Sequence, residues 1–215
     1  MDVVESFFSV AEPAQRLLES PEVASSWDRP SALAEYSVAG LAGHLVRAVG
    51  RIELLIERPE PTGAELVGLA AFFGANRVEV PADRDSELQR AVRRDGEAAG
   101  LAGPVALALQ FGQLVERLRP LLAATARDRL VPVFTIQHGA TTLEDYMRSR
   151  VVEVVVHTDD LAASVGVTAP EPGPEPASVV IGVLLELARD RRGNLAVIRA
   201  LSRSERAGPD ALRAL

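Results

Sequence analysis

The sequence contains no cysteine and no lysine, and each absence removes whole classes of chemistry. Without cysteine there is no disulfide, no thiolate metal ligand and no cysteine nucleophile, so any thiol that the chemistry needs must arrive as a separate small molecule. Without lysine there is no Schiff-base chemistry and no phosphate-binding lysine loop. All 23 basic residues are therefore arginine, and codon usage in a GC-rich genome explains this most simply.

The chain also lacks an excess of positive charge and a long apolar run. Its net charge is −7, so the electrostatic footprint of a nucleic-acid-binding protein is missing. No run approaches the roughly 18 apolar residues that cross a bilayer, so we expect no membrane partner. The first residues, MDVVE, are acidic where a secretory or transit signal is basic, and we expect a cytoplasmic protein.

Apolar residues make up 47% of the 215 residues, enough for one sizeable domain with a small appendage. In the first quarter of the chain they recur at helical spacing. Residues 3–19 predict an amphipathic helix with Pro13 as a kink or break, and a connecting loop follows over residues 20–36. Ser37 is a suitable N-cap for a second helix that ends before Pro59.

The middle of the chain has a weaker pattern. Residues 64–73 predict a short helix, and residues 86–127 predict helix interrupted by three glycines and a proline, Gly96, Gly100, Gly103 and Pro104. Residues 129–136 are rich in β-branched side chains and predict a short strand. Pro132 confines such a strand to the edge of a sheet because proline cannot donate a hydrogen bond.

Residues 141–166 predict one long helix, although residues 151–156 (VVEVVV) favour a strand. The span is long for a strand and ordinary for a bundle helix, so we expect burial to override local propensity. Gly166 is a suitable C-terminal stop. Two pairs could form a capping box at the start, Thr141 with Glu144 or Thr142 with Asp145.

The chain therefore predicts an all-α protein, with a bundle over residues 1–168. Residues 169–176 (APEPGPEP) predict a proline-rich linker. Residues 177–215 predict a short C-terminal helical extension of two helices that are hinged at Gly193.

Four polar residues on the helix predicted over 141–166 form one stripe at spacings of three, four and three: Arg150, Glu153, His157 and Asp160. Residues four apart on a helix have Cβ atoms about 5–6 Å apart, which suits two ligands of one metal ion. In a strand the same offset would be about 13 Å. The alternative is an intrahelical ion pair, but the flanking residues are apolar and a buried charge is costly unless it is paired or bound to a metal.

His44 is the candidate third ligand, at the edge of the apolar face of the helix that follows Ser37. Two histidines and a carboxylate suit zinc, nickel, iron or manganese and leave coordination positions open. The alternative is a core histidine with an ordinary hydrogen bond. Arg150 is either a functional cation or the ion-pair partner of Glu153, and Asp160 either orients His157 or is a plain polar residue. His138, beside a glycine in a loop, fits a surface histidine.

Two segments resemble the signatures of the mycothiol-dependent maleylpyruvate isomerase family. Residues 27–44 (WDRPSALAEYSVAGLAGH) resemble its first signature, a Trp, a Leu, an aromatic residue before a helix and a His. Residues 150–161 (RVVEVVVHTDDL) resemble its second, R-x-x-E-x-x-x-H-x-x-D-L. The resemblance spans roughly residues 5–166. It implies the DinB-like fold, a four-helix bundle with a metal ion between helices, and the family's three metal ligands match His44, Glu153 and His157.

The resemblance implies a metal-dependent, mycothiol-using transferase or isomerase that acts on a small electrophile. Its cofactors would be a divalent ion, zinc before nickel, iron or manganese, and mycothiol, with Arg150 and Asp160 as catalytic residues and Arg47 as a cofactor-binding residue. Isomerases of the family carry a larger C-terminal domain, whereas only about 40 residues follow the linker here. A hydrolase that uses bound water and a non-catalytic metal- or ligand-binding bundle of the stress response are the alternatives, and a homodimer stays open.

Overall fold

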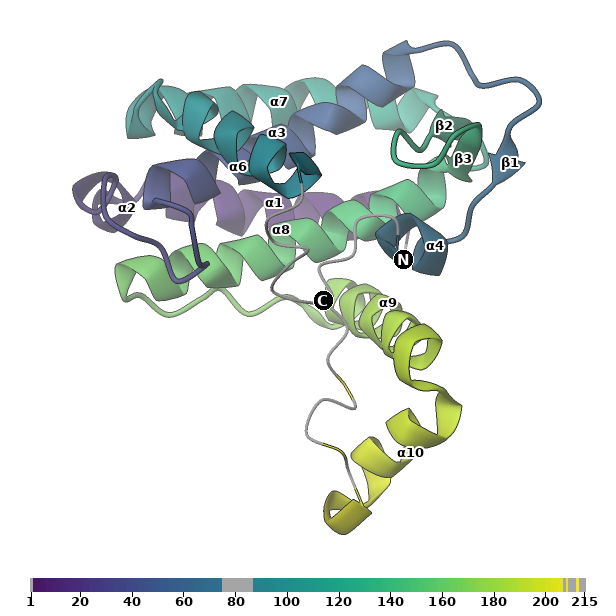
Figure 1. The fold of residues 1–215 in the computed structure, drawn as a ribbon. Coiled ribbons are helices and arrows are strands. Elements are labelled where there is room, and N and C mark those ends of the chain that lie inside the picture. The colour runs from purple at the N-terminus through teal and green to yellow at the C-terminus, as the bar shows by residue number, and fades with distance from the viewer. Residues whose placement is uncertain (1, 75–86, 207, 209–211, 213–215) are drawn as a thin grey trace.

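The computed structural model describes residues 2–74, 87–206, 208 and 212, and four long helices form its centre. They pack in a ring in which each contacts two neighbours, in the order α1, α8, α3, α7 (Figure 1): α1 (Val3–Leu18), α3 (Val38–Glu57), α7 (Pro104–Ala124) and α8 (Leu143–Val165). Their inward faces bury large apolar side chains completely, among them Phe7, Leu45, Ile52, Phe111 and Met147. The prediction of an all-α four-helix bundle is confirmed.

Helix α8 forms as predicted in spite of its run of valines. The side chain of Thr142 accepts a hydrogen bond from the backbone N–H of Asp145 at 3.1 Å, so the second of the two candidate caps is the one used. Gly166 ends the helix with φ of 74°, a left-handed conformation that glycine adopts without strain. Val151, Val152 and Val154 are buried, which is the tertiary packing that outweighs their preference for strands.

Three details of the first half differ from the prediction. Helix α1 runs through Pro13 without a break, because Ala11 and Ala14 on either side are fully buried and packing holds the turn together. The loop that follows contains the short helix α2 (Pro21–Ser25). The helix predicted over residues 64–73 is instead strand β1 (Glu65–Leu66) followed by helix α4 (Leu69–Gly74).

A small sheet lies at one end of the bundle. Its strands follow the order β1-β3-β2, with β3 (Gly139–Thr142) in the centre, parallel to β1 and antiparallel to β2 (Leu130–Pro132). Pro132 therefore lies on an edge strand, as its missing N–H requires. Strand β3 was not predicted, because its residues were assigned to the start of the helix that follows.

The region predicted as interrupted helix forms two helices, α6 (Glu87–Gly100) and α7, separated at Gly103 and Pro104. Ser86 lies outside the described residues. Helix α6 buries only its glycines, Gly96 and Gly100, and these lie directly against the backbone of α3. A Cβ on Gly96 would lie 2.7 Å from the carbonyl oxygen of Gly40, so no larger residue fits without displacing a helix. Gly96 is thus a packing glycine and not a helix break.

Substituting Gly43→Ala should therefore loosen α6. Its new Cβ would overlap the carbonyl oxygen of Gly96, an atom of the backbone that cannot rotate away. We expect the free energy of unfolding in urea to fall by about 1–3 kcal/mol. The matched control is Gly50→Ala on the same helix, where the nearest atom lies 3.6 Å away, and this variant should be unchanged or up to about 1 kcal/mol more stable. Equal behaviour of the two variants would show that the close approach of α3 and α6 is unimportant.

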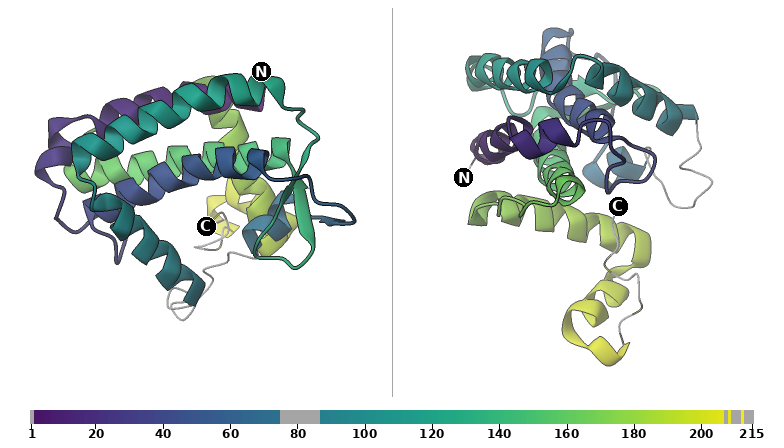
Figure 2. Two further views of the ribbon diagram at one scale, coloured as in Figure 1. Left: turned by 90° about the horizontal axis from the view of Figure 1, so that it is seen from above. Right: turned by 90° about the vertical axis from the view of Figure 1, so that its left-hand side faces the viewer.

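The C-terminal extension consists of α9 (Pro174–Arg192), α10 (Asn194–Ser202) and the short helix η1 (Ser204–Arg206). Helix α9 packs against α8, α1 and α4, whereas α10 contacts α9 and projects away from the bundle (Figures 1 and 2). Gly193 separates the two helices at φ of 82°, at the predicted hinge. Helix α9 begins at Pro174, inside the segment predicted as linker, because proline is well tolerated in a first helical turn.

No single helix in the described part of the chain is long and apolar enough to cross a membrane. Helices α6 and α7 satisfy that criterion only when taken together, across a bend of 106°.

Candidate metal centre

Helices α3 and α8 run antiparallel (Figure 1), and one stripe of each faces the other. Glu153 and His157, one turn apart on α8, meet His44 of α3. Oε2 of Glu153 lies 3.3 Å from Nε2 of His157 and 3.6 Å from Nε2 of His44. The three ligand atoms all lie within 4.8 Å of one another. The structure thus brings together the three side chains that the sequence proposed as ligands.

These distances suit a metal ion. In a tetrahedral zinc site with bonds of about 2.0–2.1 Å, neighbouring ligand atoms are about 3.3 Å apart, close to both distances from Glu153. The side chains of His44, Glu153 and His157 keep 19%, 23% and 17% of their surface exposed. The site is therefore shielded on most sides and accessible on one, which leaves room for a further ligand of the ion.

The charges of the three groups fit the same interpretation. Burial lowers the pKa of His44, so its imidazole is neutral at neutral pH and can bind a metal directly. Burial opposes the charge on His157 too, but Asp160 and Glu153 outweigh it and raise its pKa to about 9. Burial likewise opposes the charge of Glu153, yet Arg150 and the two histidines hold the pKa of that carboxyl well below its ordinary value. Without a metal ion, the proton on His157 balances the carboxylate.

The remaining predicted site residues surround this cluster. Oδ2 of Asp160 lies 3.1 Å from Nδ1 of His157, which turns Nε2 toward Glu153. Arg150 keeps 8% of its side chain exposed, lies 4.9 Å over the ring of Tyr146, and has its Nη2 3.8 Å from Oε1 of Glu153. Arg47 lies one turn from His44 and forms an ion pair of 2.6 Å with Asp95 of α6.

The cluster opens into a cavity of about 670 Å³ between α3, α8, α4, α6 and the loop before α3. The three candidate metal ligands, Arg47 and Arg150 line one part of it, and apolar side chains of α3, α4 and α6 line another. A cavity that combines an apolar wall with a few converging polar groups is typical of a small-molecule site. His138, by contrast, is exposed in the turn between β2 and β3, as predicted for a surface histidine.

Sequence reasoning missed several residues of this cavity. Tyr36 lies edge-on to His44, with ring centroids 5.9 Å apart, but its place before the helix gave no sign of that contact. Phe72 and Phe73 of α4 were assigned to an unremarkable helix. Arg191 reaches the cavity from α9, although no residue of the extension was predicted to belong to the site. Of these cavity residues, only Arg51 could be placed near His44 from the sequence, because it lies two turns later on the same predicted helix.

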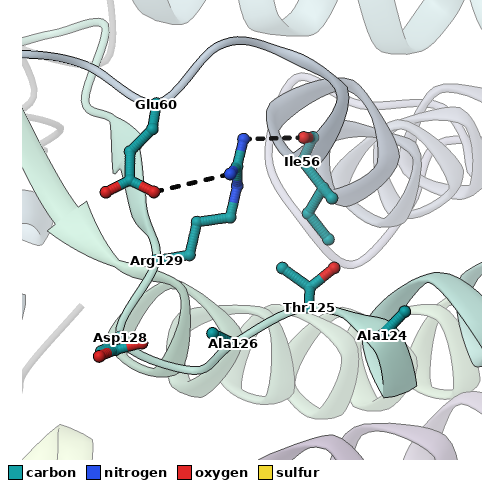
Figure 3. Close-up of a pocket in the computed structure, with 7 residues that line it drawn as sticks. All are labelled: Ile56, Glu60, Ala124, Thr125, Ala126, Asp128 and Arg129. Atoms are coloured by element: carbon teal, nitrogen blue, oxygen red, sulfur yellow. Dashed lines mark hydrogen bonds and ion pairs between the residues drawn. The ribbon is translucent and has the colours of Figure 1, made fainter.

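A second hollow, of about 440 Å³, lies at the C-terminal end of α3 (Figure 3). Arg129 occupies its wall and donates hydrogen bonds to the backbone oxygens of Ile56 at 3.1 Å and Arg58 at 2.7 Å. It also faces Glu60 at 3.6 Å. The guanidinium thus satisfies carbonyl groups that the end of a helix leaves without partners, and it has a structural role.

The family described as the mycothiol maleylpyruvate isomerase N-terminal domain matches residues 10–162. The chain belongs to this family. No curated protein and no solved structure matches the chain. The match begins within α1, spans α3 and α7, and ends within α8 after the candidate ligands, so all three candidate ligands lie inside it.

Membership of the family gives the first signature a structural meaning. The indole N–H of Trp27 donates to the backbone oxygen of Gly100 at 3.2 Å, which ties the loop before α3 to the end of α6. Glu97 of α6 accepts hydrogen bonds from the backbone N–H and the hydroxyl of Ser37 at 2.9 and 2.7 Å. The loop thus anchored holds Tyr36 beside His44. The signature residues therefore build one wall of the cavity.

Proposed function

We propose that this protein is a metal-dependent, mycothiol-using transferase or isomerase that acts on a small electrophile. The observation that supports this most directly is the cluster of His44, Glu153 and His157 at the wall of the cavity, with one side open. Family membership supports mycothiol as the thiol. The absence of cysteine agrees with it, because the chain has no thiol of its own.

A divalent ion in this site would lower the pKa of a thiol bound to it and so supply a thiolate at neutral pH. The protein's residues would prepare that position. Asp160 accepts the Nδ1 proton of His157 and fixes the tautomer whose Nε2 can bind the ion. Arg150 compensates the charge of Glu153 and presents a cation to the substrate. Arg47, one turn from His44, would contact the thiol cofactor.

The open cavity beside the cluster would hold the electrophile. Attack of a thiol on an epoxide forms a C–S bond as a C–O bond breaks, and the ring oxygen takes a proton and stays in the product as a hydroxyl. Attack on a halide forms a thioether and releases the halide and the proton of the thiol. With a cis-alkene acid, addition followed by elimination gives the trans isomer, and the thiol is recovered. Excluding water from the apolar part of the cavity would favour the thiol over hydrolysis.

Two other functions make different predictions. A hydrolase would use the same ion to activate water and would need no thiol. A non-catalytic bundle would bind the ion, or a small ligand, and convert nothing. Turnover that requires a thiol distinguishes our proposal from the hydrolase. Turnover of any kind distinguishes it from the non-catalytic bundle.

The test is spectroscopic. In cobalt-substituted protein, mycothiol should produce a sulfur-to-cobalt charge-transfer band, and S-methylated mycothiol should not. The band should also be missing from His44→Ala, which removes the ligand on α3. An unchanged cobalt spectrum at saturating mycothiol, or turnover of an electrophile panel without thiol, would overturn the proposed function and leave the metal centre intact.

A further inference from the structure

The cavity has a second polar end, away from the candidate metal centre. Helix α3 lines the cavity with His44, Arg47, Arg51 and Leu55, and α8 lines it with Tyr146, Arg150, Glu153 and His157. Because the helices are antiparallel, Arg51 lies opposite the Tyr146 end of α8. Arg51 is seven residues from His44, and Tyr146 seven from Glu153, so both lie about 10 Å along the helices from the ligands.

This far end carries positive charge with little to balance it. Arg51 is exposed and forms no ion pair, and the hydroxyl of Tyr146 forms no hydrogen bond, among residues 2–74 and 87–206. Arg150 is almost fully buried and already pairs with Glu153, with its Nη2 3.8 Å from Oε1. A guanidinium that lines a cavity without a carboxylate partner, as Arg51 does, is suited to bind an anionic ligand.

Aromatic and aliphatic side chains surround these polar groups. The ring of Phe72 packs edge-on against Tyr146, with centroids 6.1 Å apart, and Phe73 and Leu55 line the cavity beside it. Leu55 and Phe73 are otherwise buried, at 3% and 7% exposed. This wall shields the end of the cavity at Arg51 and Tyr146 from water, and ionic hydrogen bonds are stronger where water is excluded.

We propose that the electrophile is an elongated carboxylic acid whose carboxylate binds Arg51 and the hydroxyl of Tyr146. Its chain runs from there past Ala48 and Val152, which line the cavity between the two ends, and its reactive carbon reaches the metal centre. This inference rests on the proposed function. It adds the substrate class and names Arg51 as the residue that determines specificity.

The separation of the two ends sets the length of the ligand. About 10 Å along the helices divides Arg51 from the level of His44. The carboxyl carbons of butanedioate are about 4 Å apart, so this short diacid cannot reach both ends.

The protonation state of Tyr146 agrees with a bound carboxylate. Burial raises its pKa, although Arg150 and Arg51 lower it, so the phenol keeps its proton and can donate to a carboxylate.

The experiment uses zinc-loaded protein, isothermal titration and three probes: 4-phenylbutanoate, 4-phenylbutanamide and butanedioate. We expect 4-phenylbutanoate to bind at least about tenfold more tightly than the other two. Arg51→Met should remove at least about tenfold of that affinity and leave the amide unaffected. The matched control is Arg16→Met, which removes an exposed arginine of α1 that does not line the cavity. This control should change neither the affinity for 4-phenylbutanoate nor that for 4-phenylbutanamide.

Equal binding of acid and amide, or full acid affinity in Arg51→Met, would overturn the inference. If removing zinc abolishes acid binding and Arg51→Met does not change it, the carboxylate binds the metal. That result would overturn the inference too. The charge-transfer band of cobalt protein with mycothiol should persist in Arg51→Met. If the cobalt-substituted protein without the Arg51→Met change shows no such band, the proposed function is refuted. The carboxylate site at Arg51 is not refuted by that result, because acid binding is measured without thiol.

Discussion

His157→Ala should lose at least about 100-fold of the protein's affinity for zinc. The side chain supplies one of the three atoms that lie within 4.8 Å of one another. Four-ligand zinc sites bind with about 10–16 kcal/mol, so one ligand accounts for roughly 3 kcal/mol, or about a factor of 100. Competition with a chromophoric chelator measures the affinity, and elemental analysis should find close to one ion per chain in the unsubstituted protein.

The control for this variant is His138→Asn, which removes an exposed histidine of the β2–β3 turn. Asparagine is chosen because His138 has φ of 58°, a conformation that asparagine tolerates better than alanine. The control should bind zinc with unchanged affinity. If His157→Ala retained the affinity of the control while folded, the ligand assignment would be wrong.

Zinc affinity should rise about tenfold between pH 7 and pH 8 and less steeply as the pH approaches 9. The metal-free site holds a proton on His157, whose pKa is raised to about 9, and the metal must displace it. His44 contributes no proton there because its pKa is lowered from 6.5. Titration in buffers of different ionisation enthalpy should therefore show close to one proton released per ion at pH 7.5.

Asp160→Asn tests the cause of this dependence. Removing the carboxylate at 3.1 Å takes away one of the two groups that raise the pKa of His157, so the rise in affinity should level off at a lower pH. In metal-free protein the raised pKa stabilises the fold fully below pH 6.5, and that contribution is lost as the pH rises through 9. A zinc affinity that is flat from pH 7 to 9 would show that His157 is not protonated in the metal-free site.

The sequence predicted which three side chains would meet, because their spacing carried the information. Glu153 and His157 are four residues apart, and only a helix lets that spacing serve one ion. His44 could be placed on a facing helix because Ser37 and Pro59 mark where that helix begins and ends. The family signatures then selected the same three residues, and the family match agrees with the suspected family.

The rest depends on contacts between distant segments, which spacing does not encode. Nothing local shows that Gly96 packs on Gly40 or that Tyr36 lies beside His44. The short strand β1 is defined by its pairing with β3, and residues 64–73 alone favour a helix. The described residues that line the cavity come from seven such segments, so its ligand class could not be predicted before its walls were known. The division of the chain at residues 168 and 176 stays a prediction.

The position of α9 has a practical consequence for that division. Arg191, at the end of α9, lines the same cavity as the candidate metal ligands, and α9 packs on α8, α1 and α4. A shortened protein that stops at residue 168 would keep every proposed ligand but would lack this part of the wall. It would also expose the apolar side chains that α9 buries against the bundle, Val180, Val183 and Leu187, so a minimal scaffold for redesign would need to reach at least residue 192.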